Sequence, residues 1–217
     1  AGVLIVTGDT KVVPRGCGDG IYINTAGVGE LIEGVDIAPT NIKAGMDIIV
    51  SGTLGDHAAT VMAARHNLTL PPEIMSDSAP LCHLAAAMLA AAPSIAVLRD
   101  PTRGGVAASL NELAEAAGVG ILLDEATIPV HPAVQGVCDI LGFDPLTLAN
   151  EGKLLAFVPP EDTERVLAVM RADPHGRASC VIGHTTAEAP GSVGLRTALG
   201  GIRVVDLPLG ELVPRIC

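Results

Sequence analysis

The chain has 217 residues, of which 49% are hydrophobic and 1% aromatic, so its core must be built from aliphatic side chains. The formal net charge of −11 argues against a nucleic-acid partner held by phosphate contacts, and the scarcity of aromatic residues removes the stacking platforms that single strands need. No apolar run reaches the roughly 18 residues of a membrane-spanning helix. We therefore expect neither a nucleic-acid partner nor a membrane partner.

The cysteines indicate the redox compartment and one candidate reactive group. There are five, an odd number without a CxxC pair, which favours free thiols in a reducing cytoplasm over disulfides or a zinc site. Cys217 is the last residue and closes the sequence Pro214-Arg215-Ile216-Cys217. A terminal thiol can reach into a pocket, be modified there and leave again, although many such thiols are inert.

Residues 1–45 resemble the end of a domain rather than its beginning. The chain starts at Ala1, almost directly in an apolar stretch, and strands are expected at Val3–Val6 and Ile21–Thr25 with glycine-rich turns between them. An irregular connector follows, and we place a domain boundary at residue 45. This pattern predicts a chain that lacks the N-terminal part of a longer protein.

From residue 46 short apolar strands alternate with helices, which indicates a layered α/β domain over residues 46–206. The expected strands are 47–51, 95–98, 121–124, 154–158 and 181–185, with a hairpin over 192–206 that implies a mixed sheet. The expected helices are 56–65 with Asp56 as its N-cap, 78–92, 106–117 ending at Gly118, 132–141 and 162–171. Residues 207–217 are predicted to be a mobile, proline-containing tail.

The turn Gly8-Asp9-Thr10-Lys11 combines a carboxylate, a hydroxyl and an ammonium group. Such a set suits a metal–phosphate site, with Asp9 holding Mg²⁺ and Lys11 neutralising phosphate oxygens. Asp19 adds a second carboxylate on a nearby glycine-rich loop. Ordinary surface turns are the alternative interpretation for both segments.

Two strand-to-helix loops are candidate anion sites. Gly52-Thr53-Leu54-Gly55 presents backbone N–H groups at a helix N-terminus, where anions bind, but it lacks the GKS/T ending of a Walker A loop. In the second loop, 100–105, Arg103 is placed to hold phosphate through charge-assisted hydrogen bonds. His57 either takes part in catalysis or packs on its neighbours.

Glu151 lies beside a glycine in the sequence Asn150-Glu151-Gly152-Lys153 and is a candidate general base. A solvated loop glutamate is the alternative. The sequence contains no Ser–His–Asp pattern, GxSxG or HExxH motif.

Taken together and in order, these motifs resemble one family. The chain is similar to the HypE hydrogenase maturation proteins, members of the PurM-like (aminoimidazole ribonucleotide synthetase-related) superfamily of ATP-dependent enzymes. The loop Asp100–Gly105 is typical of the superfamily, and the ending Pro-Arg-Ile-Cys is what singles out HypE. The resemblance covers essentially the whole chain and implies a PurM-like C-terminal α/β domain, preceded by the last strands of the ATP-binding N-terminal domain.

The resemblance also implies a reaction and its partners. A carbamoyltransferase, HypF, loads a carbamoyl group onto the C-terminal cysteine, Cys217. ATP then phosphorylates the carbamoyl oxygen, phosphate leaves, and the resulting thiocyanate donates cyanide to iron on a HypC–HypD complex for the [NiFe]-hydrogenase cofactor. Lys11 and Glu151 become candidates for proton handling. The implied ligands of ATP and Mg²⁺ are Asp9, Thr10, Asp19, Gly52, Gly55 and Arg103, with Asp9 and Asp19 at the metal.

One departure leaves alternatives open. Family members begin with an ATP-binding domain, which contributes to the ATP site and to a homodimer, and only residues 1–45 correspond to it here. The chain is therefore expected to be an enzyme, a carbamoyl dehydratase, as part of the full-length protein. Two alternatives are another PurM-like ATP-dependent enzyme, such as one that makes selenophosphate or thiamine phosphate, and a non-catalytic docking fragment.

Overall fold

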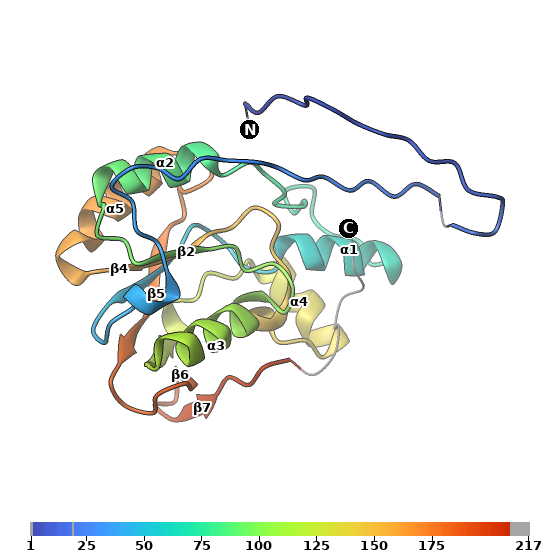
Figure 1. Cartoon of the computed structure of the whole chain (residues 1–217). Coiled ribbons are helices and arrows are strands. Elements are labelled where there is room, and N and C mark those ends of the chain that lie inside the picture. The colour runs from blue at the N-terminus through green and yellow to red at the C-terminus, as the bar shows by residue number, and fades with distance from the viewer. Residues whose placement is uncertain (1, 19, 209–217) are drawn as a thin grey trace.

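A computed structural model describes residues 2–18 and 20–208 of the chain (Figure 1). Asp19 and the terminal Cys217, both predicted to be functional, lie outside the described residues. The tail predicted over residues 207–217 also lies outside them, apart from its first two positions.

A seven-stranded sheet forms the centre of the protein, in the order β2-β4-β1-β5-β3-β6-β7. Neighbouring strands are antiparallel except for β3 and β6, which are parallel, so the predicted mixed sheet is confirmed. The expected hairpin is β6 and β7. The strands are β1 (Asp47–Val50), β2 (Val97–Arg99), β3 (Gly120–Asp124), β4 (Leu155–Val158), β5 (Cys180–Thr186), β6 (Val193–Arg196) and β7 (Ile202–Val204).

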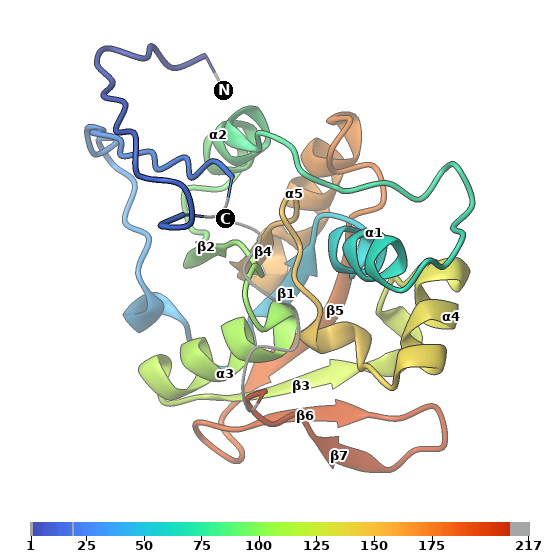
Figure 2. The same ribbon diagram turned by 90° about the vertical axis from the view of Figure 1, so that its right-hand side faces the viewer.

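Helices cover both faces of this sheet, as Figure 2 shows. In β1, Ile48 and Val50 belong to the core that includes α3, whereas Ile49 faces the core that includes α2 and α5. The strand therefore has no polar face, and all three residues are completely buried. A third apolar cluster joins α1 to α4. The helices are α1 (Asp56–Arg65), α2 (Cys82–Ala91), α3 (Gly105–Ala117), α4 (Pro132–Leu141) and α5 (Pro160–Ala172).

Several helix starts differ from the prediction. Helices α3 and α5 begin one and two residues early, at Gly105 and Pro160. Gly55, with φ of +81°, caps α1, and Asp56 is the first helical residue rather than the cap. Helix α2 begins at Cys82 rather than near residue 78, because the residues before it lie against the loop that precedes β4. None of the helices in the described ranges is long and apolar enough to span a membrane.

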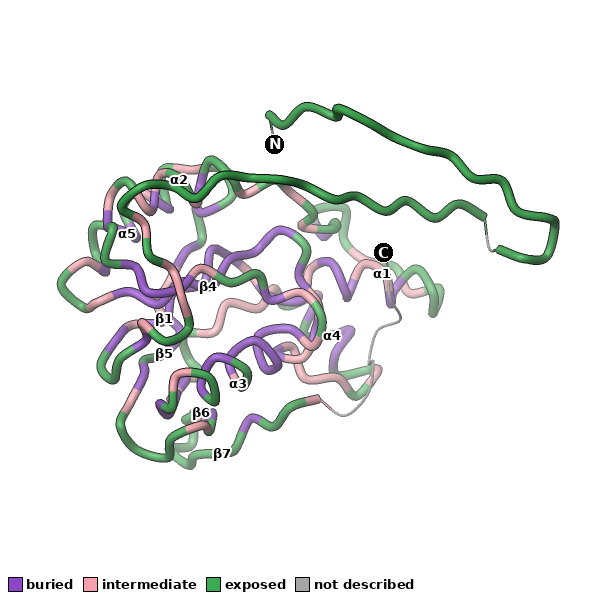
Figure 3. Tube along the Cα trace, viewed as in Figure 1, coloured by how far each residue is buried: buried purple, intermediate pink, exposed green. Residues whose placement is uncertain are grey.

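The strands predicted at Val3–Val6 and Ile21–Thr25 are wrong. Residues 2–18 and 20–38 contain neither helix nor strand, and Leu4 and Ile5 are 87% and 94% exposed. The segment extends away from the sheet and is exposed along most of its length (Figures 1 and 3). An apolar segment becomes a strand only where a neighbour pairs with its backbone and covers one face, and the described residues provide neither.

Candidate functional site

Three of the loops selected from the sequence meet at one buried side chain. The Oδ1 atom of Asn150, which is completely buried, accepts a hydrogen bond from the Gly55 N–H at 2.8 Å. Its Nδ2 group donates to the backbone oxygens of Leu148 at 2.9 Å and of Pro101 at 3.2 Å. Because buried polar groups must be paired, Asn150 holds the 51–55, 100–105 and 148–153 loops in one arrangement.

Close backbone contacts fix the same loops. At Gly152 an added Cβ atom would lie 1.7 Å from the backbone oxygen of Asp77, so no other residue fits there without movement. At Gly55 the positive φ and a Cβ position 2.9 Å from Leu148 have the same consequence. The glycines of these motifs therefore permit close packing of loop against loop.

A buried ion cluster lies beneath the loops. The Lys153 Nζ atom lies 2.9 Å from Oδ2 of Asp77 and 3.5 Å from Oδ2 of Asp56. The three side chains are only 10%, 4% and 14% exposed, respectively. Thr53 Oγ1 donates a hydrogen bond to the same oxygen of Asp56. The cluster carries two carboxylates and one ammonium group, and the other Asp56 oxygen, Oδ1, is buried without a partner among the described residues.

His57 lies beside this cluster, at the start of α1. Its Nδ1 atom is 2.7 Å from Ser76 Oγ, and its Nε2 atom is buried with no partner among the residues that the structure describes. The whole residue is 7% exposed. It therefore links α1 to the segment that carries Asp77.

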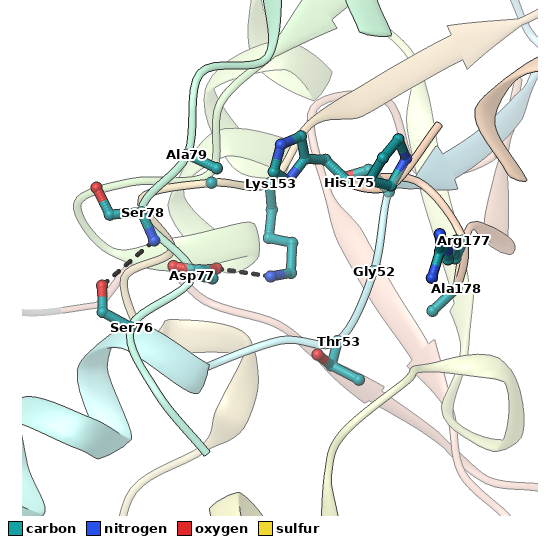
Figure 4. A pocket seen from close by; sticks show the side chains of 13 residues that line it. Gly52, Thr53, Ser76, Asp77, Ser78, Ala79, Lys153, His175, Arg177 and Ala178 are labelled. Atoms are coloured by element: carbon teal, nitrogen blue, oxygen red, sulfur yellow. Dashed lines mark hydrogen bonds and ion pairs between the residues drawn. The ribbon is translucent and has the colours of Figure 1, made fainter. Parts of the chain in front are cut away.

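A polar pocket of about 350 Å³ opens over Lys153 (Figure 4). Residues 76–79 lie on one side, Gly52 and Thr53 form another part of the lining, and the loop carrying His175 and Arg177 completes it. Both of these basic residues are exposed. A second hollow of about 280 Å³ shares Thr53 and includes Asp56 and His131. Hydroxyl, carboxylate and cationic groups thus line the first pocket, which suits a polar ligand.

The predicted site residues fall into two groups. Gly52 lines the pocket, Gly55 is held by Asn150, and exposed Arg103 and Glu151 lie on the two other loops that Asn150 joins. The structure does not bring the second group, Asp9, Thr10 and Lys11, to these loops. That group is exposed on the extended segment 2–18 (Figure 1).

The sequence reasoning missed Asp56, Asp77 and Lys153 as site residues. One signal was present, because Lys153 lies two residues before a strand of four buried residues, and a lysine in such a place needs carboxylate partners. Nothing in local spacing identified those partners. Asp77 lies 76 residues away in the chain.

Two internal thiols are held in their protonated form. Burial, with the nearby carboxylates of Asp139 and Asp144, raises the pKa of Cys138 to about 11. Burial also raises the pKa of Cys180. Since the thiolate is the nucleophile, both are weak nucleophiles at neutral pH, whereas Cys17 and Cys82 are exposed.

Residues 43–196 match the family described as AIR synthase related protein, C-terminal domain. The chain is 52% identical over its whole length to carbamoyl dehydratase HypE of Rhodobacter capsulatus, and 50% identical to that of Cupriavidus necator. It spans 64% and 62% of those two proteins.

Solved structures agree with these relatives. The crystal structure of a hydrogenase maturation protein HypE matches with a TM-score of 0.80 and 40% identity, over 83% of this chain and 58% of that one. A HypE–HypF complex matches with a TM-score of 0.77 and 39% identity, over 82% of this chain and 58% of that one. A HypE in complex with ATP matches with a TM-score of 0.78 and 40% identity, over 83% of this chain and 55% of that one. The chain therefore belongs to the AIR synthase related family, as a relative of its HypE members.

Proposed function

We propose that the full-length protein carrying this chain is an ATP-dependent carbamoyl dehydratase of [NiFe]-hydrogenase maturation. The observation that supports this most strongly is the 52% identity to a named carbamoyl dehydratase over every residue of the chain, including the segment that ends in Cys217. In the proposal Cys217 carries the substrate as a thiocarbamate, and HypF is the carbamoyl donor.

The proposed chemistry removes one water from the carbamoyl group. ATP transfers its terminal phosphoryl group to the carbamoyl oxygen, and the nitrogen loses one proton. The C–O bond then breaks, phosphate leaves, and the nitrogen loses its second proton as the C≡N bond forms. Phosphorylation is needed because an amide oxygen is a poor leaving group, and a base is needed for the protons.

Glu151 is the residue that we propose as a base within this chain. Its side chain is exposed, while its backbone belongs to the loop that Asn150 holds beside Gly55 and Pro101. A carboxylate that is open to a reactant on a fixed backbone suits proton transfer. Lys11 shares this role in the proposal, once the full-length protein brings its segment to the loops.

The phosphate groups of ATP are proposed to contact Gly52, Gly55, Thr10 and Arg103. The other ATP ligands, Asp9 and Asp19, are proposed to hold Mg²⁺. Over residues 2–18 and 20–208, no three or more His, Cys, Asp or Glu side chains are gathered to hold a metal. Asp9 by itself does not make a magnesium site.

Further partners and the location complete the proposal. The cyanide is passed to iron on a HypC–HypD complex, the full-length protein is a homodimer, and it acts in the cytoplasm. The cysteine pattern supports the location, because free thiols are typical of a reducing compartment.

Intact mass spectrometry tests the reaction. The full-length protein is incubated with a HypF carbamoyltransferase, carbamoyl phosphate and ATP, and we expect the C-terminal peptide to gain one carbamoyl group and then lose one water. Cys217→Ser must show neither change. Turnover of a free small molecule by Cys217→Ser, with no mass change in the wild type, would instead favour another PurM-like enzyme. No change and no turnover would favour a docking fragment.

A further inference from the structure

Residues 66–81, between α1 and α2, contain no helix or strand, and the part around Asp77 and Ala79 lies against the loop that carries Glu151. Within this segment Asp77 has a side chain that is only 4% exposed, although it is charged. Its Oδ1 atom accepts a hydrogen bond from the Glu151 N–H at 3.0 Å, and its Oδ2 atom accepts one from Lys153 Nζ at 2.9 Å.

The backbone of Asp77 contacts the residue between these two partners. Its carbonyl oxygen occupies the space beside Gly152, where a Cβ atom would be 1.7 Å away. One residue thus holds three consecutive positions of the loop. Figure 4 shows the Asp77 side chain directed toward the Lys153 ammonium group, with Ser76 and Ser78 on either side in sequence.

Glu151 needs such support because its own side chain is exposed and so is not fixed by packing. On one side its backbone follows Asn150, whose side chain makes three hydrogen bonds to neighbouring loops. On the other side the Glu151 N–H is held by Asp77. The backbone from which the Glu151 side chain projects is therefore held by two residues with buried polar side chains.

We propose that Asp77 is a positioning residue for Glu151, acting through the hydrogen bond to its backbone N–H and the ion pair to Lys153. This inference rests on the proposed function, in which Glu151 accepts a proton from the carbamoyl nitrogen. A base must lie within hydrogen-bond reach of the proton that it removes, so a small displacement of its backbone slows the chemical step. Asp77 is not among the residues proposed to contact ATP, so its loss should leave ATP binding largely unchanged.

The test uses the full-length protein, loaded with the carbamoyl group, and follows water loss by mass spectrometry in a single turnover. Asp77→Ala removes the acceptor and the ion pair, and we expect a rate about 10- to 100-fold lower, the range for a base misplaced by about 1 Å. Asp77→Asn keeps an oxygen that can accept from the Glu151 N–H but loses the ion pair to Lys153, so its rate should lie between those of Asp77→Ala and the wild type. The ATP concentration at half-maximal rate should stay unchanged in both variants.

A double-mutant cycle separates positioning from a general structural effect. Because Asp77 acts through Glu151, Asp77→Ala combined with Glu151→Gln should be no slower than Glu151→Gln by itself. Glu112→Gln is the matched control, since it removes the exposed ion pair with Arg99 and should leave the rate unchanged. Amide hydrogen exchange of residues 149–154 should accelerate in Asp77→Ala and not in the control.

The rates of these variants show whether Asp77 positions Glu151. Wild-type rates in Asp77→Ala, or losses that multiply in the double variant, overturn the positioning role while the role of Glu151 stands. A wild-type rate in Glu151→Gln overturns both roles, because the base itself is then dispensable. If Asp77→Ala does not fold, Asp77→Ala with Lys153→Met also removes the stranded ammonium group and takes its place in the cycle.

Discussion

The side-chain oxygen of Asn150 accepts a hydrogen bond from the Gly55 N–H at 2.8 Å, across 95 residues of sequence. The same side chain donates to Pro101 and Leu148, so one completely buried amide joins three loops. We expect Asn150→Ala to lower the free energy of unfolding by about 2–4 kcal/mol, since each buried polar group left unpaired costs about 1–3 kcal/mol. Urea denaturation measures this change.

Asn41→Ala is the matched control for that experiment. Asn41 donates one exposed hydrogen bond to the Asp36 backbone oxygen, and its loss should change stability by less than about 1 kcal/mol. Equal effects of the two substitutions would contradict the joining role of Asn150.

Gly152→Ala should be strongly destabilising, because the new methyl group would lie 1.7 Å from the Asp77 backbone oxygen and force the two loops apart. Gly136→Ala, within α4, meets nothing within 4 Å and should be neutral or stabilising by up to about 1 kcal/mol, as alanine is the better helix former. Thermal unfolding of both variants makes the comparison. A Gly152→Ala protein as stable as the wild type would show that the two loops can separate without loss.

Lys153→Ala should destabilise the protein by about 3–5 kcal/mol, since it leaves the Asp56 and Asp77 carboxylates buried together without their cation. Arg99→Ala breaks an ion pair whose side chains are 43% and 56% exposed, and should cost less than about 1 kcal/mol. Chemical denaturation of both variants at low and high salt distinguishes the two ion pairs. The effect of Arg99→Ala on the free energy of unfolding should shrink at high salt, because salt screens only the exposed pair well. A small, salt-sensitive effect at Lys153 would place that residue in solvent.

We expect the Cys138 thiol to make the folded protein less stable at alkaline pH. Its pKa rises from 9.0 to about 11 on folding, so the unfolded chain loses this proton first. The protonated Cys138 thiol therefore makes its full contribution to the free energy of unfolding below pH 9. That contribution is lost as the pH rises toward 11, and the loss amounts to about 2–3 kcal/mol at most. Unfolding measured from about pH 8 to pH 10.5 should show a shallower decline in Cys138→Ala than in the wild type.

Cys17→Ala provides the comparison for Cys138, because Cys17 is exposed. The stability of Cys17→Ala should decline with rising pH in parallel with that of the wild type. At neutral pH iodoacetamide should also label Cys17 before Cys138. Parallel declines in all three proteins would show that Cys138 does not titrate in this range.

Local sequence predicted most of the α/β body. Helix α4 has the expected bounds because Pro132 suits a first helical position and Gly142, with φ of +74°, ends the helix. Helix α3 ends at Gly118 for the same reason. These signals act within a few residues of the boundary that they define, so they can be read from the chain.

Prediction failed where structure depends on distant partners. The apolar stretch Val3–Val6 has the composition of a strand but no neighbour to pair with among the described residues. Helix α2 starts at Cys82 rather than near residue 78, and the segment before it is held against the Glu151 loop through Asp77.

The sequence by itself determined the α/β class, the family and the motifs that carry Gly52, Arg103 and Glu151. Only the tertiary structure decided that Asn150 joins those motifs and that Lys153 is buried between Asp56 and Asp77. The reason is physical: periodicity and capping are local, whereas the pairing of a buried charge is satisfied by whichever residues the fold brings close.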